Sequence, residues 1–230
     1  MEILQTSEFW IGLLKIIWIN IILSGDNAVV IALAARSLPA EQQRKAILWG
    51  SGAAVILRIV LTVVAVKLLA LPFLEIIGGV LLLYIGVQLL SGEDGGEDGH
   101  STVKSSLAAA VRTILIADVV MSLDNVIAVA AAAGGSTVLL VLGLAISIPL
   151  VVFGSTLMIK LMSRYPIIVV LGAALIGWVA GETIMADHVL HDTVVTNPWL
   201  HYAAAAAGAI FVVLVGKALA ARGRARSVAA

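Results

Sequence analysis

Long apolar segments constrain the fold of this chain more than any other feature of its sequence. A bilayer crossing of roughly 30 Å takes about 20 mostly apolar residues in a helix. Seven segments meet this length, near residues 9–35, 46–70, 72–91, 106–133, 136–160, 166–186 and 199–220. Strand-like alternation is absent, and 61% of the residues are hydrophobic against 12% charged. We therefore predict an all-α membrane protein with seven transmembrane helices.

A short polar motif interrupts the first apolar segment and recurs in the second half of the chain. Its two copies pair Asn20 with Asp118, Ser24 with Ser122, Asp26 with Asp124, and Asn27 with Asn125. The similarity extends further, since Gly50 aligns with Gly143 and Lys67 with Lys160. The first three segments therefore correspond to the second three.

Each of these repeats holds an odd number of predicted spans, so the second must enter the membrane from the opposite side. This is the inverted-repeat arrangement of many secondary transporters, whose ion sites lie near the membrane midplane. We predict two inverted three-helix repeats plus a C-terminal helix. The predicted parts are a first repeat (1–91), an acidic Gly-rich cytoplasmic linker (92–105), a second repeat (106–186), and a C-terminal part (187–230) with an external loop, a seventh helix and a basic tail.

Basic residues predict the orientation of the spans. Eleven of the 14 Lys and Arg residues fall in connections on one side: Arg36, Arg44, Lys45, Lys104, Arg112, Lys160, Arg164, Lys217, Arg222, Arg224 and Arg226. Only Lys67 falls in a connection on the other side. By the positive-inside rule the N-terminus is outside and the C-terminus is cytoplasmic. We expect the first segment to stay in the mature protein, because Asn20 and Asp26 do not suit a cleavable signal.

Ionisable side chains inside membrane helices cost ~2.5–3.5 kcal/mol each on insertion scales unless they are paired, hydrated or bound to a metal. Four carboxylates fall within the predicted spans: Asp26, Asp118, Asp124 and Glu182. We expect them to share a cation at the membrane midplane. The amide and hydroxyl partners would come from the motif itself: Asn20, Ser24, Asn27, Ser122 and Asn125.

Helical geometry refines this expectation. Asp118, Ser122 and Asn125 share one face of a helix, because spacings of four and seven return to the same side. Asp124 points about 120° away from Asp118 on a straight helix. We therefore predict that both motif-bearing helices are broken or kinked, and Gly25 favours unwinding in the first copy.

The predicted ligands are hard oxygen donors, which suit Mg²⁺, Ca²⁺ or Mn²⁺. The chain has no cysteine, and imidazoles are missing from the predicted membrane core, so Cu⁺ and Zn²⁺ are disfavoured. Met121 and Met185 are the nearest soft atoms, and methionine in an apolar helix is more typical of core packing.

Several polar features have two interpretations. Glu182 aligns with the neutral Gln88, so it could add charge to the site or accept a proton, or it could be hydrated at the outer interface. Arg58 aligns with Val151 and either pairs with a site carboxylate or snorkels to the membrane surface. For the acidic linker with His100 and for the loop with His188 and His191, we favour a solvated segment over a metal site.

The doubled Ser-x-Asp-Asn sequence, with Asn20 before one copy and Asp118 opening the other, resembles the TerC family, as do the seven predicted spans and the acidic linker. This resemblance implies a bacterial inner-membrane protein, related to the LysE-type transporter superfamily and associated with export of Mn²⁺ from the cytoplasm. Carried over to this chain, the acidic metal-binding positions are Asp26, Asp118, Asp124 and Glu182, with Asn27 and Asn125 as amide partners.

We therefore predict a secondary transporter, and not an enzyme, that exports a divalent cation by alternating access, with Mn²⁺ as the expected cation and no further cofactor. The membrane potential opposes export of a divalent cation by ~4.6 kcal/mol per 100 mV, which favours proton exchange. The alternatives are an intramembrane acid–base enzyme with paired aspartates, or an accessory membrane protein that delivers metal to exported proteins. The expected partners are the metal ion and the lipid bilayer, not nucleic acid. The oligomeric state stays open, a homo-oligomer included.

Overall fold

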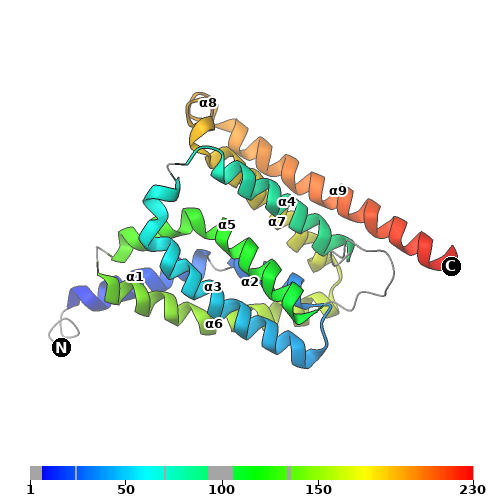
Figure 1. Cartoon of the computed structure of the whole chain (residues 1–230), viewed down its shortest axis with the longest axis horizontal. Helices are drawn as coiled ribbons and strands as arrows, with labels where there is room; N and C mark the ends of the chain where they lie inside the picture. The colour runs from blue at the N-terminus through cyan, green and yellow to red at the C-terminus, as the bar shows by residue number, and fades with distance from the viewer. Residues whose placement is uncertain (1–6, 24, 70, 93–105, 134–135, 230) are drawn as a thin grey trace.

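The structure is a computed structural model, which describes residues 7–23, 25–69, 71–92, 106–133 and 136–229. Every regular element in these ranges is helical, which confirms the predicted all-α class (Figure 1). The elements are α1 (Ser7–Leu23), α2 (Gly25–Ala35), α3 (Ala40–Leu69), α4 (Leu74–Ser91), α5 (Leu107–Ala133), α6 (Thr137–Arg164), α7 (Ile167–Ala186), the 3₁₀ turn η2 (His188–Leu190), α8 (His191–Thr196) and α9 (Trp199–Ala229).

Five of these helices contain stretches long and apolar enough to cross a membrane, counted over the described residues. The stretches are Ala40–Thr62, Leu74–Ser91, Val141–Arg164, Ile167–Ala186 and Trp199–Gly223. Two shorter apolar helices, Phe9–Ile19 and Gly25–Ala35, occupy the first predicted span. The number of seven spans stays a prediction.

Three helices carry the two copies of the polar motif. The first copy lies on the end of α1, at Leu23, and the start of α2, at Gly25; Ser24 lies outside the described residues, so the predicted break there stays a prediction. In the second copy, α5 runs without interruption from Leu107 to Ala133, so a break there is wrong, and a kink stays a prediction. Leu123 stands in α5 where the first copy has Gly25, and leucine favours the helix by about 1 kcal/mol relative to glycine.

Some helix boundaries also differ from the prediction, and α9 continues to Ala229 rather than ending near 220. Helix α3 begins at Ala40 rather than near 46, because its polar first turns continue the helix. Gln43 in these turns donates to the carbonyls of Arg36 and Leu38, at 3.2 and 2.9 Å, and so ties α3 to the end of α2. The predicted external loop contains η2 and the short helix α8. The acidic linker falls on residues 93–105, outside the described residues.

The helices pack in two groups that meet along α2, α4, α5 and α7 (Figure 1). One group contains α4, α7 and α9, and the other contains α1, α2, α3, α5 and α6. A buried cluster joins the groups, with Leu33 of α2, Leu82 of α4, Met121 of α5 and Ile176 of α7. Met121 is buried in this apolar cluster, as expected for a packing residue.

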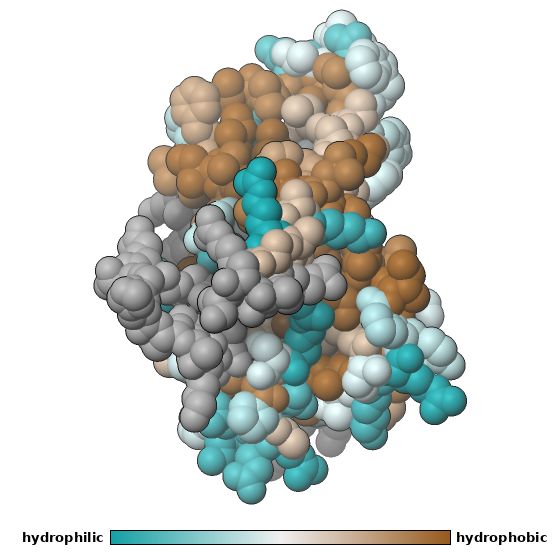
Figure 2. Space-filling view, turned by 90° about the vertical axis from the view of Figure 1, so that its right-hand side faces the viewer, coloured by the Kyte–Doolittle hydropathy of each residue, from teal (hydrophilic) through white to brown (hydrophobic). Residues whose placement is uncertain are grey.

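Successive long helices run in opposite directions, so the ends of α2, α4, α6 and α9 lie at the same end of the molecule as the starts of α3, α5 and α7 (Figure 1). Figure 2 looks onto this end and shows hydrophilic side chains there beside apolar surfaces. The described basic residues of the predicted cytoplasmic connections, such as Arg36, Arg44 and Arg164, belong to these helix ends, whereas Lys67 lies near the end of α3 at the opposite end. That this end faces the cytoplasm stays a prediction.

Candidate functional site

A buried ion pair joins α3 to α5. Nη2 of Arg58 donates to Oδ1 of Asp118 at 2.6 Å, and Nε of Arg58 donates to Oγ of Ser122 at 2.8 Å. Oγ of Ser122 donates in turn to Oδ2 of Asp118 at 3.2 Å. The side chains of Arg58 and Asp118 are only 4% and 7% exposed. The contact confirms that Asp118 and Ser122 share one face of α5, and it answers the question left open for Arg58: this side chain pairs with a carboxylate.

A small cavity lies beside this ion pair. Its wall contains Asn27, Ile31, Ser51, Ala54, Val55, Arg58, Asp118 and Val151. The space open to the centre of a water-sized sphere is about 10 Å³, which is about the room for one water molecule. Oγ of Ser51 is buried in this wall and has no hydrogen-bond partner among the described residues. The cavity therefore offers carboxylate, amide and hydroxyl groups to a small polar or cationic ligand.

Helix α2 brings the first motif copy to the same neighbourhood. Asp26 interacts electrostatically with both Arg58 and Asp118, and the buried Asn27 lines the cavity. The backbone N–H of Asn27 donates to Oδ1 of Asp26 at 2.7 Å. Such a contact is typical of the first turn of a helix, where backbone N–H groups lack partners within the helix. The start of α2 thus aims polar groups at the ion pair on α3 and α5.

The remaining motif residues are only partly described. Asn125 is half-buried on α5 and lies outside the set that lines the cavity. Asn20 belongs to α1 and Asp124 to α5, but their side chains, and all of Ser24, lie outside the described residues. Within the described part of the chain, no three His, Cys, Asp or Glu residues gather in one place. The metal-binding roles of these residues therefore stay predictions.

Glu182 lies at a different interface. Its Oε1 accepts a hydrogen bond from Nε1 of Trp178 at 2.8 Å and lies 3.6 Å from Nε2 of His201 on α9. The Glu182 and His201 side chains are each 35% exposed. Glu182 therefore contacts the seventh predicted helix rather than the cavity beside Asp118, and its place in a cation site stays a prediction.

Asp187, in the segment with His188 and His191, has a structural role. Its carboxylate accepts hydrogen bonds from the backbone N–H groups of Phe73, Glu75 and Ile76 at the start of α4, and from that of Val189 in η2, at 3.0–3.2 Å. Burial raises the pKa of the Asp187 carboxyl, but these donors outweigh burial and lower the pKa overall. Asp187 thus joins the end of α7 to the start of α4.

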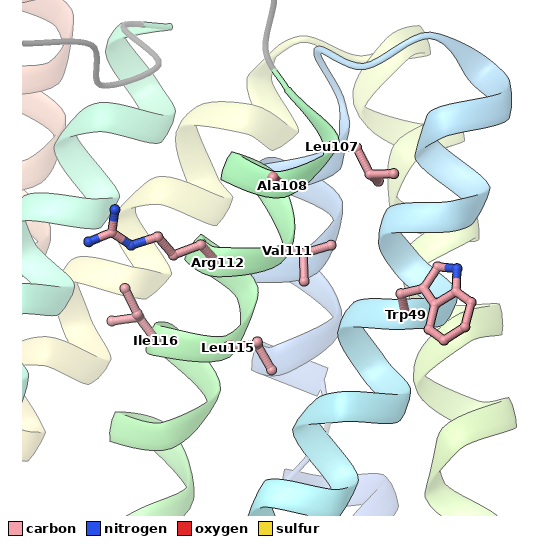
Figure 3. Close-up of a pocket in the computed structure, with 7 residues that line it drawn as sticks. All are labelled: Trp49, Leu107, Ala108, Val111, Arg112, Leu115 and Ile116. Atoms are coloured by element: carbon pink, nitrogen blue, oxygen red, sulfur yellow. The ribbon is translucent and has the colours of Figure 1, made fainter.

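A larger, open groove on the outside of the bundle is chemically unlike the cavity. It is lined by Trp49, Leu107, Ala108, Val111, Arg112, Leu115 and Ile116, and its lining is mostly apolar. Figure 3 shows Arg112 and Ile116 extending from α5 on the side away from Trp49. A cation would meet no carboxylate in this groove, so the candidate site is the small cavity.

Ser51 is the cavity residue that the sequence interpretation missed. It is buried on α3, seven positions before Arg58, and this spacing returns to the same face of a helix. A hydroxyl on the same face as a buried arginine, within an apolar helix, is the signal that could have identified it.

Comparison with known proteins agrees with this membrane architecture. The chain is 45% identical over 195 residues to the uncharacterized membrane protein YjbE of Bacillus subtilis, covering 82% of this chain and 88% of that protein. It is 27% identical over 217 residues to the uncharacterized membrane protein YkoY of the same organism, covering 84% of this chain and 65% of YkoY. No solved structure matches the chain.

An inner-membrane protein is also among the relatives. The UPF0053 inner membrane protein YoaE of Escherichia coli is 29% identical over 189 residues, which are 74% of this chain and 36% of YoaE. This chain is accordingly a multi-pass integral membrane protein with inner-membrane relatives. Residues 5–224 match the integral membrane protein TerC family, and the chain therefore belongs to this family.

Proposed function

We propose that this protein is a secondary transporter that exports a divalent cation, with Mn²⁺ as the cation, through the cavity between α2, α3, α5 and α6. The observation that carries this proposal is the buried Asp118 carboxylate, which engages a cationic side chain beside a polar cavity. A carboxylate inside a membrane protein is costly, and such residues mark ion pathways. Asn27 of α2 and Asp118 of α5 line the same cavity, so a cation here would bind between the two motif copies.

The ligand chemistry supports a hard cation. Asn27, Ser51 and Asp118 offer amide, hydroxyl and carboxylate oxygens to one cavity. Ser122 bonds to Asp118 beside it, and Asp26 precedes Asn27 in the chain. Such oxygens suit Mn²⁺, Mg²⁺ and Ca²⁺. The cavity has room for about one water molecule, so the cation would bind with protein oxygens in place of most of its hydration shell. Mn²⁺ is proposed among the hard cations because of the resemblance described above.

Inverted repeats are part of the proposal, and repeat-related packing supports them. Helix α3 packs on α5, and its counterpart α6 packs on α1 and α2. At the residue level, a Cβ at Gly50 would meet Ile114, and a Cβ at Gly143 would meet Ile16. The two glycines align with each other in the repeats, and Ile114 follows Ile16 by the same 98 positions as the motif.

The cavity itself contains a second repeat-related pair. Oγ1 of Thr62 donates to the carbonyl of Arg58, and Oγ of Ser155 donates to the carbonyl of Val151, both at 2.7 Å. Arg58 and Val151 align in the repeats and line the same cavity. These contacts support a pseudo-two-fold axis near the cavity, which is where transporters with inverted repeats bind their ions.

The further parts of the proposal concern direction and energy. The N-terminus is outside and the C-terminus is cytoplasmic in the inner membrane of a bacterium, because the basic connections belong to the cytoplasmic side. Export against the membrane potential uses exchange with protons. Asp118 pairs with an arginine rather than with a second carboxylate, which does not favour an enzyme with paired aspartates.

Equilibrium binding of Mn²⁺ to the purified protein tests the proposal. Mn²⁺ should bind, Mg²⁺ and Ca²⁺ should compete, and Asp118→Asn should weaken Mn²⁺ binding at least about tenfold, or about 1.4 kcal/mol. Asp192→Asn is the matched control, because Asp192 is an exposed carboxylate in α8. Binding of Zn²⁺ alone, or Mn²⁺ binding that is unchanged in Asp118→Asn, would contradict the proposed site.

A further inference from the structure

Arg58 binds the carboxylate of Asp118 in the way that a cation would. It donates to one carboxylate oxygen of Asp118, while Ser122, which also accepts from Arg58, donates to the other. The remaining space in the cavity has room for about one water molecule. A metal ion at Asp118 would therefore lie next to a guanidinium that is also positively charged, and the two would repel each other strongly in so buried a place.

The two repeats differ in charge at this ion pair and nowhere else in the cavity wall. Asp118 of the second repeat aligns with the neutral Asn20, which adds one negative charge to the second repeat. Arg58 of the first repeat aligns with the neutral Val151, which adds one positive charge to the first repeat. The added carboxylate and the added cation bond directly to each other. Each repeat thus has one charge that the other lacks, and these two charges are opposite. This match indicates that the two residues act as a pair.

We propose that Arg58 is a tethered cation that binds Asp118 whenever the transported metal is absent, and that the metal binds Asp118 only after the guanidinium has left. This inference rests on the proposed transport function and adds the residue that competes with the metal. Arg58 is thus a determinant of metal affinity. Because Arg58 neutralises Asp118 in the metal-free state, proton exchange falls to other carboxylates of the site.

The pairing has a consequence for the transport cycle. Net transport requires the empty protein to reorient, whereas exchange of metal for metal requires only the loaded protein to do so. Without Arg58 the empty protein would have to reorient with an unpaired buried carboxylate, which is costly in a membrane interior. Arg58 therefore supports the return of the empty protein.

The test compares Mn²⁺ binding by the intact protein and by Arg58→Val, which introduces the residue of the aligned position. Removal of the competing cation should tighten Mn²⁺ binding at least about tenfold. Arg58→Lys keeps the charge but cannot bond to Asp118 and Ser122 in the same fork, so it should tighten Mn²⁺ binding to a smaller degree. This second variant keeps the test possible if Arg58→Val fails to fold. Arg112→Gln is the control, because Arg112 is exposed and lies outside the cavity.

Transport in proteoliposomes supplies the second readout. In Arg58→Val, or in Arg58→Lys to a lesser degree, net Mn²⁺ flux should fall about tenfold or more, while exchange of Mn²⁺ for Mn²⁺ should persist. Unchanged or weaker Mn²⁺ binding in both Arg58 variants, with binding still dependent on Asp118, would overturn this inference alone. Mn²⁺ binding that does not depend on Asp118 in the intact protein would overturn the proposed function as well.

Discussion

Arg58 and Asp118 each compensate the buried charge of the other in the interior of the bundle. Removing one partner of a buried ion pair leaves an uncompensated charge, which costs about 3 to 5 kcal/mol, whereas removing both can be nearly neutral. Ser122 also bonds to both residues, so the network holds α3 against α5. The pair therefore contributes to structure as well as to the proposed site.

A double-mutant cycle tests this coupling. Arg58→Val and Asp118→Asn should each lower the stability of the metal-free protein by several kcal/mol, and the double variant should be more stable than the sum of the two effects implies. The free energy of unfolding in detergent micelles is measured for the three variants and for the parent protein. Strictly additive effects would mean that the two side chains do not stabilise each other.

Asp187 predicts how stability depends on pH at the start of α4. Its folded-state pKa is lowered below the ordinary 3.8, so its stabilising contribution is complete above the unfolded pKa and is lost as the pH falls through the folded pKa. The free energy of unfolding of the parent protein should therefore fall by about 0.5–2 kcal/mol at acidic pH, as it does when a helix loses its cap.

Asp187→Asn should lower stability at neutral pH and remove this acid-dependent loss, since the neutral amide does not titrate. Asp192→Asn, at an exposed carboxylate in α8, should leave the pH dependence unchanged. Unfolding followed between pH 3 and pH 7 distinguishes the two. An identical acid response of Asp187→Asn and the parent protein would contradict the capping role.

The motif residues were predictable because they are polar residues in apolar segments, repeated at a constant distance. The partner of Asp118 was not, because Arg58 lies on another helix, and only the packing of α3 against α5 decides whether its long side chain pairs or snorkels. For the same reason the sequence could not reveal that Glu182 contacts His201 of α9, since α9 has no counterpart in the repeats.

At the level of helices, α7 and α9 approach each other so closely that their backbones nearly touch. A Cβ at Gly181 would meet backbone atoms of Ala204 and Ala205, and a Cβ at Gly177 would meet those of Gly208. Backbone atoms cannot move aside as a flexible side chain can. Small residues at such crossings are the usual means of close helix packing in membranes.

Gly181→Ala should therefore push α9 away from α7 and lower stability by about 1–3 kcal/mol. Gly52→Ala is the matched control, because a Cβ at Gly52 of α3 meets nothing within 4 Å, and alanine favours a helix over glycine. The midpoint temperatures of thermal unfolding in micelles are compared for the two variants. An equal effect of both substitutions would contradict the close crossing.

Most helix boundaries followed from the apolar segments to within a few residues, but the polar start of α3 and the basic end of α9 did not. In the first copy of the motif the predicted break falls at Ser24, outside the described residues, and it stays a prediction. A break is absent from α5, where the symmetry of the motif was extended to a position that holds Leu123 instead of glycine. Local helix propensity outweighed the repeat at that position.

For the whole molecule, the orientation in the membrane is the property that the packing leaves undetermined. The chain has no cysteine, so single-cysteine variants report one position each. His191→Cys in α8 and Ser163→Cys in α6 lie at exposed positions, and the basic connections place them on opposite sides. In intact cells a membrane-impermeant thiol reagent should label His191→Cys and not Ser163→Cys. The reverse pattern would invert the proposed orientation.

The proposed repeat arrangement and the proposed orientation together define the two ends between which the metal would move. Two inverted halves around the cavity would open it alternately to each side, and the proposed export runs from the basic, cytoplasmic end to the end that carries α8. The sequence indicates the two halves through aligned residues, while only the folded chain brings Arg58 and Val151 into one cavity wall.

Uptake of Mn²⁺ into everted membrane vesicles tests the central claim most directly, because export from the cytoplasm becomes uptake in this geometry. Vesicles with the parent protein or with Asp192→Asn should accumulate Mn²⁺ and change their lumenal pH as they do so. Vesicles with Asp118→Asn should show uptake reduced at least about tenfold, in line with the loss of a charged ligand. Uptake by Asp118→Asn at the rate of the parent protein would contradict the account.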